Sequence, residues 1–192
     1  EASRKHLAEV AEQVFDRFAE APVRVETTLA EQFLRAGGLT AVTSKTDPLN
    51  LVQITGGIPS INRDQKALVS IRDYLDRTGT VDGKRLIDCL TDAPFGWSPD
   101  TLRYLVAALL LAGEIKLRVS GREVTVNGQQ AIEALKTNNA FKSVGVALRD
   151  NRPSIRVVAC AAERLTELVG DLVVPLEEEI SKTASKHLPQ FQ

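Results

Sequence analysis

The sequence predicts a mainly α-helical protein with a small β-hairpin, which places it in the α+β class. Two observations support this prediction. Apolar residues recur at spacings of three and four in several segments, which is typical of amphipathic helices. One short segment instead alternates apolar and polar residues on both sides of a Ser-Gly pair, which is typical of a hairpin. The 192 residues, 43% of them hydrophobic and 26% charged, are enough to bury one core or two small ones.

Residues 1–59 are expected to form an N-terminal helical segment and a linker. Apolar residues share one stripe over 1–19, which predicts an amphipathic helix. Thr28 is expected to cap a second short helix, which Gly37-Gly38 would end. Residues 40–60 are rich in glycine and proline and are interpreted as an irregular connection. The boundary of the next domain is therefore placed after residue 59.

Residues 60–128 are predicted to form a central domain that begins with three helices. The first begins near Asp64 and ends at Gly79, and residues 80–83 are expected to form a turn. The second helix covers 84–90. The third is expected to begin after Ser98, a favourable N-cap followed by proline, and to end near residue 112.

A hairpin is predicted to follow the third helix, around the two-residue turn Ser120-Gly121. This turn sets three cross-strand pairs, which are Val119 with Arg122, Arg118 with Glu123, and Leu117 with Val124. The alternation of the sequence agrees, because the apolar residues of both strands then share one face. Three helices and a hairpin within about 65 residues follow the order of a winged helix-turn-helix. The sequence therefore predicts a central winged helix-turn-helix flanked by helices.

Residues 129–192 are expected to form a C-terminal helical segment. The pattern predicts a helix over 129–135, then a loop, and then a short extended piece over 144–148. A helix over 154–169 and a last helix after Pro175 complete the prediction.

No catalytic, cofactor-binding or metal-ligating residue is predicted. A phosphate-binding loop needs a glycine-rich turn followed by Lys and Ser or Thr, and the sequence contains none. Cys89 and Cys160 lie among apolar residues and are interpreted as small buried hydrophobic residues. His6 and His187 lie in charged segments and are interpreted as surface residues. The chain is therefore not expected to be an enzyme by itself.

The composition favours a cytoplasmic setting. The sequence contains no apolar run of the roughly 18 residues that a membrane span needs, and no secretory signal. Two cysteines far apart in the sequence fit a reducing compartment. Because the chain contains no methionine, it is interpreted as a piece of a longer protein.

A winged helix raises the hypothesis of DNA binding. The residues on the outer face of the third helix can be compared with those that such binding requires. A helix that reads the major groove carries Arg, Lys, Asn or Gln on its outer face. The outer face predicted here carries Asp100, Tyr104, Ala107, Ala108 and Leu111, and Arg103 is the only basic residue of the helix. Residues 60–128 hold ten basic and nine acidic residues, which is little net charge for binding phosphates.

Three classes of function stay open. Protein–protein or interdomain contact is favoured over weak, non-specific nucleic-acid contact, and direct reading of a DNA sequence is favoured least. An enzyme with an unrecognised site is the remaining alternative. The residues that could contact a nucleic acid or a partner are Lys84, Arg85, Arg103, Lys116 and Arg122.

The segment Pro94-Phe95-Gly96-Trp97 is expected to be a rigid turn. Pro94 and Pro99 fix the backbone at its two ends, and Gly96 can adopt a positive φ. Phe95 and Trp97 could then fold onto the helices and anchor the core, which is the favoured interpretation. An exposed Trp97 that anchors a partner or stacks on a base is the alternative.

Several stretches of the sequence resemble the large P-loop ATPase of bacteriophage-exclusion (BREX) systems and the related ATPase of phage growth limitation systems. The resemblance covers roughly residues 80–190 and is carried by the stretches 92–101, 105–115, 128–132 and 135–139, with Pro94 to Trp97 the most specific part. It implies an internal or C-terminal-side fragment of a cytoplasmic anti-phage ATPase. ATP and Mg would bind in the P-loop domain of the parent, outside these residues. The implied partners are other domains of the parent and other defence-system proteins, such as the DNA methyltransferase.

Overall fold

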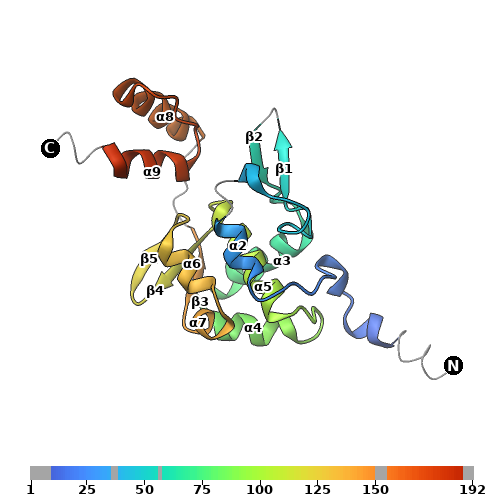
Figure 1. The fold of residues 1–192 in the computed structure, drawn as a ribbon. Helices are drawn as coiled ribbons and strands as arrows, with labels where there is room; N and C mark the ends of the chain where they lie inside the picture. Colours follow the sequence, from blue (N-terminus) through green and yellow to red (C-terminus); the bar gives the residue numbers. More distant parts are fainter. Residues whose placement is uncertain (1–9, 36–38, 56–57, 150–154, 188–192) are drawn as a thin grey trace. The chain divides into compact units, whose positions relative to one another are not determined.

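The computed structural model describes residues 10–35, 39–55, 58–149 and 155–187. The chain divides into two compact units, Glu1–Arg149 and Asp150–Gln192, and each is described by itself (Figure 1). This division differs from the expected segments 1–59, 60–128 and 129–192. Residues on both sides of 59 and of 128 contribute to one hydrophobic core, so these positions separate no compact units.

The N-terminal part of the first unit contains less helix than its apolar stripe predicts. Of the helix expected over 1–19, residues 1–9 lie outside the described part, and the helix ends at Val14. A turn and the short 3-10 helix η1 (Phe18–Glu20) follow. The backbone N–H of Arg17 donates to the carbonyl of Pro94 at 3.2 Å, a tertiary contact that takes the place of a helical hydrogen bond. Docking on this distant turn therefore ends the helix early.

Helix α2 (Leu29–Arg35) follows Thr28 as expected, and the 3-10 helix η2 (Leu39–Ala41) comes next. The predicted helix end at Gly37-Gly38 lies outside the described residues. All four apolar residues of α2 are buried in the core, at Leu29, Ala30, Phe33 and Leu34. This short helix is thus part of the fold of the first unit.

The expectation of an irregular connection over 40–60 is wrong from Val52 onward. Strands β1 (Val52–Thr55) and β2 (Ile58–Ile61) form an antiparallel hairpin, in which Ile54 lies opposite Pro59. The carboxylate of Asp47 accepts the backbone N–H groups of Leu51 and Val52, each at 2.8 Å, and so holds the start of β1.

The three central helices are confirmed as α3 (Lys66–Thr78), α4 (Gly83–Thr91) and α5 (Pro99–Leu111). Gly79 follows α3 with a φ of 71°, and the Ser98 side chain accepts the backbone N–H of Thr101 at 3.1 Å. The turn expected over 80–83 contains the short strand β3 (Val81–Asp82), which exists because a strand far along the chain pairs with it.

The predicted hairpin is confirmed with its register. Strands β4 (Ile115–Val119) and β5 (Arg122–Val124) pair Leu117 with Val124, Arg118 with Glu123, and Val119 with Arg122. Strand β6 (Gly145–Leu148), the extended piece expected over 144–148, lies between β3 and β4. The sheet order is therefore β3-β6-β4-β5, and all of its neighbours are antiparallel.

Helix α6 (Gln129–Leu135) is confirmed, and α7 (Asn138–Lys142) replaces the loop that was expected after it. The Thr137 side chain caps α7 by accepting the backbone N–H of Ala140 at 3.1 Å. Helix α7 returns the chain to α4, where the carbonyl of Val144 accepts the N–H of Gly83 at 2.8 Å.

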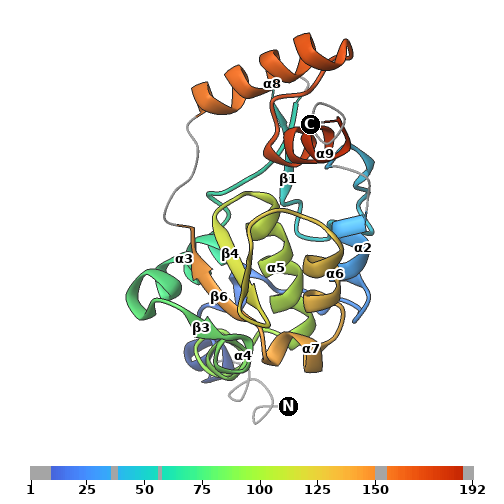
Figure 2. The same ribbon diagram turned by 90° about the vertical axis from the view of Figure 1, so that its left-hand side faces the viewer.

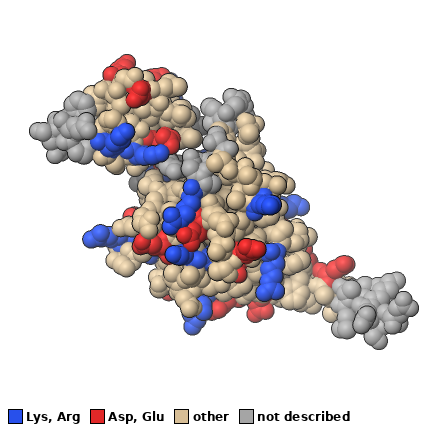
Figure 3. Space-filling model, in the orientation of Figure 1, with Lys and Arg blue, Asp and Glu red and all other residues tan. Residues whose placement is uncertain are grey.

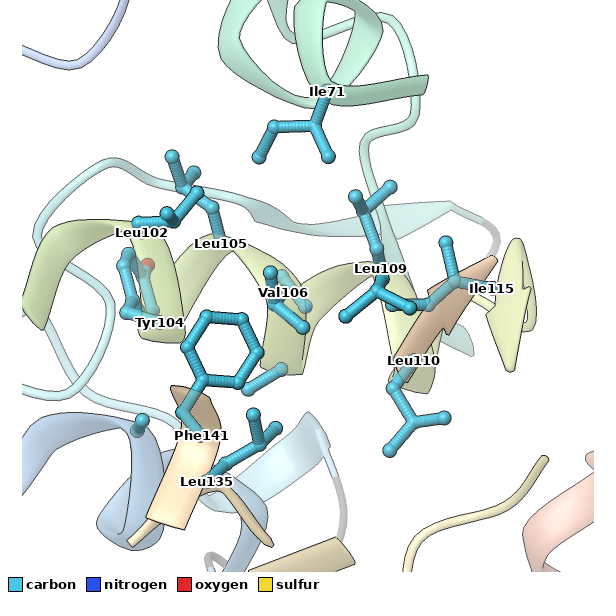
Figure 4. Packing of buried hydrophobic residues seen from close by; sticks show 14 of the residues in the cluster. Ile71, Leu102, Tyr104, Leu105, Val106, Leu109, Leu110, Ile115, Leu135 and Phe141 are labelled. Carbon is cyan, nitrogen blue, oxygen red and sulfur yellow. The ribbon is translucent and has the colours of Figure 1, made fainter. Parts of the chain in front are cut away.

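The core of the first unit is built around α5. Figure 4 places Ile71 of α3 on one side of this helix, and Phe141 of α7 with Leu135 of α6 on the other. Figure 2 shows α5 between the strands of the sheet and helices α2, α6 and α7. Ten of the thirteen residues of α5 are buried, which is unusual for a helix with one outer face.

The second unit is a pair of helices, α8 (Ile155–Val169) and α9 (Glu177–His187), which match the two helices expected there. Its small core consists of Ala162, Leu165 and Val173, with Ile180 and Ala184 packed against it. Within the described ranges of both units, no helix is long and apolar enough to cross a membrane.

Candidate interaction surfaces

The face of α5 that a DNA-reading winged helix would present is covered by other helices. Tyr104, Ala107 and Ala108 are fully buried, and Leu111 is half-buried. The ring of Tyr104 meets the ring of Phe33 in α2 edge to face, with 5.1 Å between centroids. Helix α5 therefore offers no face of the kind that enters a major groove.

The prediction that Arg103 contacts a nucleic acid or a partner is wrong, because its side chain is 0% exposed. Its guanidinium donates to the side chains of Asp100 and Asn138 at 2.5 and 2.7 Å, and to the carbonyls of Leu135 and Thr27 at 2.5 and 2.8 Å. These partners lie before α2, at the end of α6 and at the start of α7. Arg103 thus links α5 to α6, to α7 and to the segment before α2. Its side chain is not available to a nucleic acid or a partner.

A second polar contact fastens the same helix to the N-terminal part of the unit. The hydroxyl of Tyr104 donates to the carboxylate of Asp47, which also holds the start of β1. Burial raises the pKa of Tyr104 far above its ordinary value, and the hydrogen bond to Asp47 raises it further. The hydroxyl is therefore a permanent donor, and the contact is structural.

The turn Pro94 to Trp97 anchors the core, as the favoured interpretation states. Trp97 is 1% exposed, so it is not the exposed anchor or stacking platform of the alternative. Its ring packs against Phe95 with 4.8 Å between centroids, and the guanidinium of Arg17 lies 4.6 Å from the Phe95 centroid. Gly96 has a φ of 64°, as expected for a glycine-dependent turn.

The other predicted contact residues lie on the surface. Lys84 and Arg85 are exposed at the start of α4, and Arg122 is exposed at the tip of the β4–β5 hairpin. Lys116 pairs with Glu123 at 3.2 Å. The hydrogen bond from Lys116 lowers the pKa of Glu123, and Arg118 lowers it further. Of the predicted contact residues, Lys84, Arg85 and Arg122 are therefore exposed, and Lys116 is engaged with Glu123.

Sequence reasoning missed a basic group beside the sheet. Arg63 and Arg72 both pair with Glu114, at 3.2 and 3.6 Å, although they follow β2 and lie in α3 respectively. Only the alternation of charged residues at 114, 116 and 118 signalled this surface in the sequence. Arg63 and Arg72 reach Glu114 only because distant segments of the chain pack together.

Both cysteines contradict the prediction of burial, because Cys89 and Cys160 are exposed. Each lies on the outer side of an amphipathic helix, where the neighbouring apolar residues turn inward. Within the described ranges, no group of His, Cys, Asp and Glu side chains could hold a metal ion. On the face drawn in Figure 3, basic and acidic side chains are interspersed.

The helices α3, α4 and α5, followed by the β4–β5 hairpin, define the first unit as a winged helix-turn-helix domain, with an extra strand, β6, inside its sheet. The family model that describes the winged helix-turn-helix domain of the BREX ATP-binding protein BrxC matches residues 45–150. This match covers more than half of the chain, and the chain belongs to that family. No curated protein and no solved structure matched in the corresponding comparisons.

Proposed function

We propose that this BrxC-family winged helix is a non-catalytic protein-contact module. In this role it binds other domains of its parent ATPase or other proteins of the BREX system, and it does not read a DNA sequence. ATP and Mg would then bind outside the residues described here. The observation that carries the proposal is the enclosure of α5, which turns the helix that usually reads DNA into the centre of the core.

The β1–β2 hairpin offers the most direct test of the proposal. Ile54 is 74% exposed, which is high for a large aliphatic side chain. Its neighbour Gln53 is also exposed but points to the opposite face of the hairpin. Ile54→Glu and Gln53→Glu therefore add the same charge to the same strand on different faces.

The assay is gel filtration and pull-down of the 192-residue chain with each purified protein of its own BREX system. We expect at least one complex, weakened about tenfold by Ile54→Glu, which corresponds to about 1.4 kcal/mol, and little changed by Gln53→Glu. The proposal is wrong if no component binds and the chain instead binds one DNA sequence with nanomolar affinity at physiological salt.

Weak, non-specific duplex binding is the second candidate, because Lys84, Arg85 and Arg122 are exposed. Two to four phosphate contacts from such residues would give a slope of log K against log salt of about −2 to −4. Fluorescence anisotropy with unrelated duplexes at several salt concentrations measures this slope. Equal affinity for all sequences is the expected result.

A further inference from the structure

The edges of the β-strands differ in how well they are protected against pairing with another strand. An unpaired edge presents N–H and C=O groups that can bind a further strand, and proteins protect such edges with charged side chains, proline or a short length. Within the described part of the chain the two sheets have four edges, formed by β1, β2, β3 and β5. Strand β3 has only two residues, and β5 carries Arg122 and Glu123. The remaining two edges belong to the β1–β2 hairpin.

The hydrogen-bond pattern of this hairpin shows which backbone groups reach its edges. The carbonyl of Leu51 accepts the N–H of Asn62 at 2.7 Å, so these two residues form a hydrogen-bonded pair. Hydrogen-bonded pairs alternate with pairs that exchange no bond, so Val52 and Ile54 exchange none with their partners in β2. The N–H and C=O groups of Val52 and Ile54 therefore point to the outer edge of β1.

The hairpin is open to another strand at Ile54. Pro59, the partner of Ile54, has no N–H, so the outer edge of β2 lacks a donor in its middle. At the start of β1 the N–H of Val52 donates to the carboxylate of Asp47 at 2.8 Å, which closes the edge there. At Ile54 the strand contains neither proline nor a charged residue. This one residue thus offers both a donor and an acceptor to an approaching strand.

The composition around β1 also favours contact with another strand. Residues 48–62 contain no charged residue, although charged residues make up 26% of the chain and about four would be expected in fifteen positions. Ile54 is 74% exposed, and Figure 1 shows the hairpin projecting from the helices of the first unit. The charged residues that commonly prevent edge-to-edge pairing are therefore missing at the open edge.

We propose that the outer edge of β1 pairs with β1 of a second copy of this chain, which forms a continuous antiparallel sheet with the strand order β2-β1-β1-β2. A two-fold axis relates the two copies, so the paired strands run antiparallel and one residue lies opposite itself. An uncharged strand meets its own copy without the repulsion that like charges opposite each other cause.

Asp47 determines the register of this pair. With Ile54 on the two-fold axis, the N–H of each Ile54 donates to the carbonyl of the other. A shift that places Gln53 on the axis pairs Ile54 with Val52 of the second copy, whose N–H already donates to Asp47. Pairing at Ile54 is thus the register in which the central pair uses only open groups. The two Ile54 side chains then lie side by side on one face, with about 5 Å between their Cβ atoms.

Sedimentation velocity of the full chain, at concentrations from about 1 µM to 1 mM, measures this self-association. The interface is small, so we expect a weak dimer with a dissociation constant of about 10 to 100 µM. Ile54→Glu and Ile54→Lys should each weaken the dimer at least about tenfold, because like charges then lie directly opposite each other. An equimolar mixture of these two variants should associate with an affinity within about threefold of wild type, because residue 54 faces itself.

Two more variants separate the backbone contact from a general effect of charge. Gln53→Glu adds the same charge to β1 but lies opposite Thr55 of the second copy, so it should weaken the dimer less than about threefold. Ile54→Pro removes the N–H that the dimer uses and spares the β1–β2 ladder, to which Ile54 donates no bond. It should weaken the dimer at least about tenfold and leave the fluorescence of the buried Trp97 unchanged.

The inference is overturned if wild type stays monomeric at about 1 mM, or if Ile54→Glu or Ile54→Pro dimerises as well as wild type. It is also overturned if the mixture of Ile54→Glu and Ile54→Lys fails to associate. The inference goes beyond the proposed protein-contact role, and the results distinguish the two. A monomeric chain that still binds another BREX protein contradicts only the self-pairing. A dimer through Ile54 that binds no other BREX protein contradicts only the proposed function.

Discussion

Replacing Tyr104 by Phe removes one buried hydroxyl from the contact that fastens α5 to the N-terminal part of the domain. The ring and its packing on Phe33 stay, while the carboxylate of Asp47, a residue only 5% exposed, loses one of its three donors. Hydrogen bonds to charged groups contribute about 1.5 to 3 kcal/mol. Two backbone donors remain on Asp47, so we expect a loss of about 2 kcal/mol in the free energy of unfolding.

Urea unfolding followed by the fluorescence of Trp97, the single tryptophan and a buried one, measures this loss. The chain supplies its own control, because its only other tyrosine, Tyr74, donates its hydroxyl to the exposed Cys89 at 3.2 Å. Tyr74→Phe should cost less than about 0.5 kcal/mol, as surface changes do. Equal costs for the two variants would show that the Asp47 contact does not stabilise the fold.

The pH dependence gives an independent check of the same contact. The pKa of Tyr104 is raised in the folded state, so its contribution to stability is complete below the unfolded pKa of about 10 and is lost as pH rises above it. At pH 10.5 wild type should lose about 0.8 kcal/mol that Tyr104→Phe does not lose. If the difference in the free energy of unfolding between wild type and Tyr104→Phe is the same at pH 8 and at pH 10.5, the pKa of Tyr104 is not raised.

Three further predictions concern other parts of the chain. Arg103→Met leaves buried partners without a donor and should lower the free energy of unfolding by at least about 3 kcal/mol in the same urea assay. The control Arg77→Met, at an exposed position, should lower it by less than about 0.5 kcal/mol. Gly83→Ala would place a Cβ 2.1 Å from the carbonyl oxygen of Phe141 and should cost about 2 to 3 kcal/mol, while Gly128→Ala meets nothing within 4 Å and should be nearly neutral by thermal unfolding. Isothermal titration calorimetry of the chain with ATP should give no saturable heat, because the sequence has no glycine-rich phosphate loop, and micromolar binding that needs the triphosphate would refute this.

Local signals predicted those elements whose shape depends on neighbouring residues. Ser98 and Pro99 fixed the start of α5, and Ser120-Gly121 fixed the register of β4 with β5. The β1–β2 hairpin was missed although Gly56-Gly57 is a known hairpin signal, because the surrounding prolines favoured an irregular segment.

Long-range contacts were beyond the reach of the sequence. Two residues, Val81 and Asp82, are too few to show alternation, so β3 became visible only through its pairing with β6. The ion pairs of Arg63 and Arg72 with Glu114 depend in the same way on packing between distant segments. Arg103 looked like a surface residue because its partners Thr27, Leu135 and Asn138 are far away in sequence.

The position of β6 between β3 and β4 has a consequence for how the chain is made. On the ribosome β4 emerges well before its neighbour, because Gly145 follows Val119 by 26 residues, or about 1 to 5 s at 5 to 20 residues per second. During that interval the nascent chain exposes strand edges that can pair with another chain. The sheet can close only once residues 145–148 have left the exit tunnel, so the domain completes its fold late in its own synthesis.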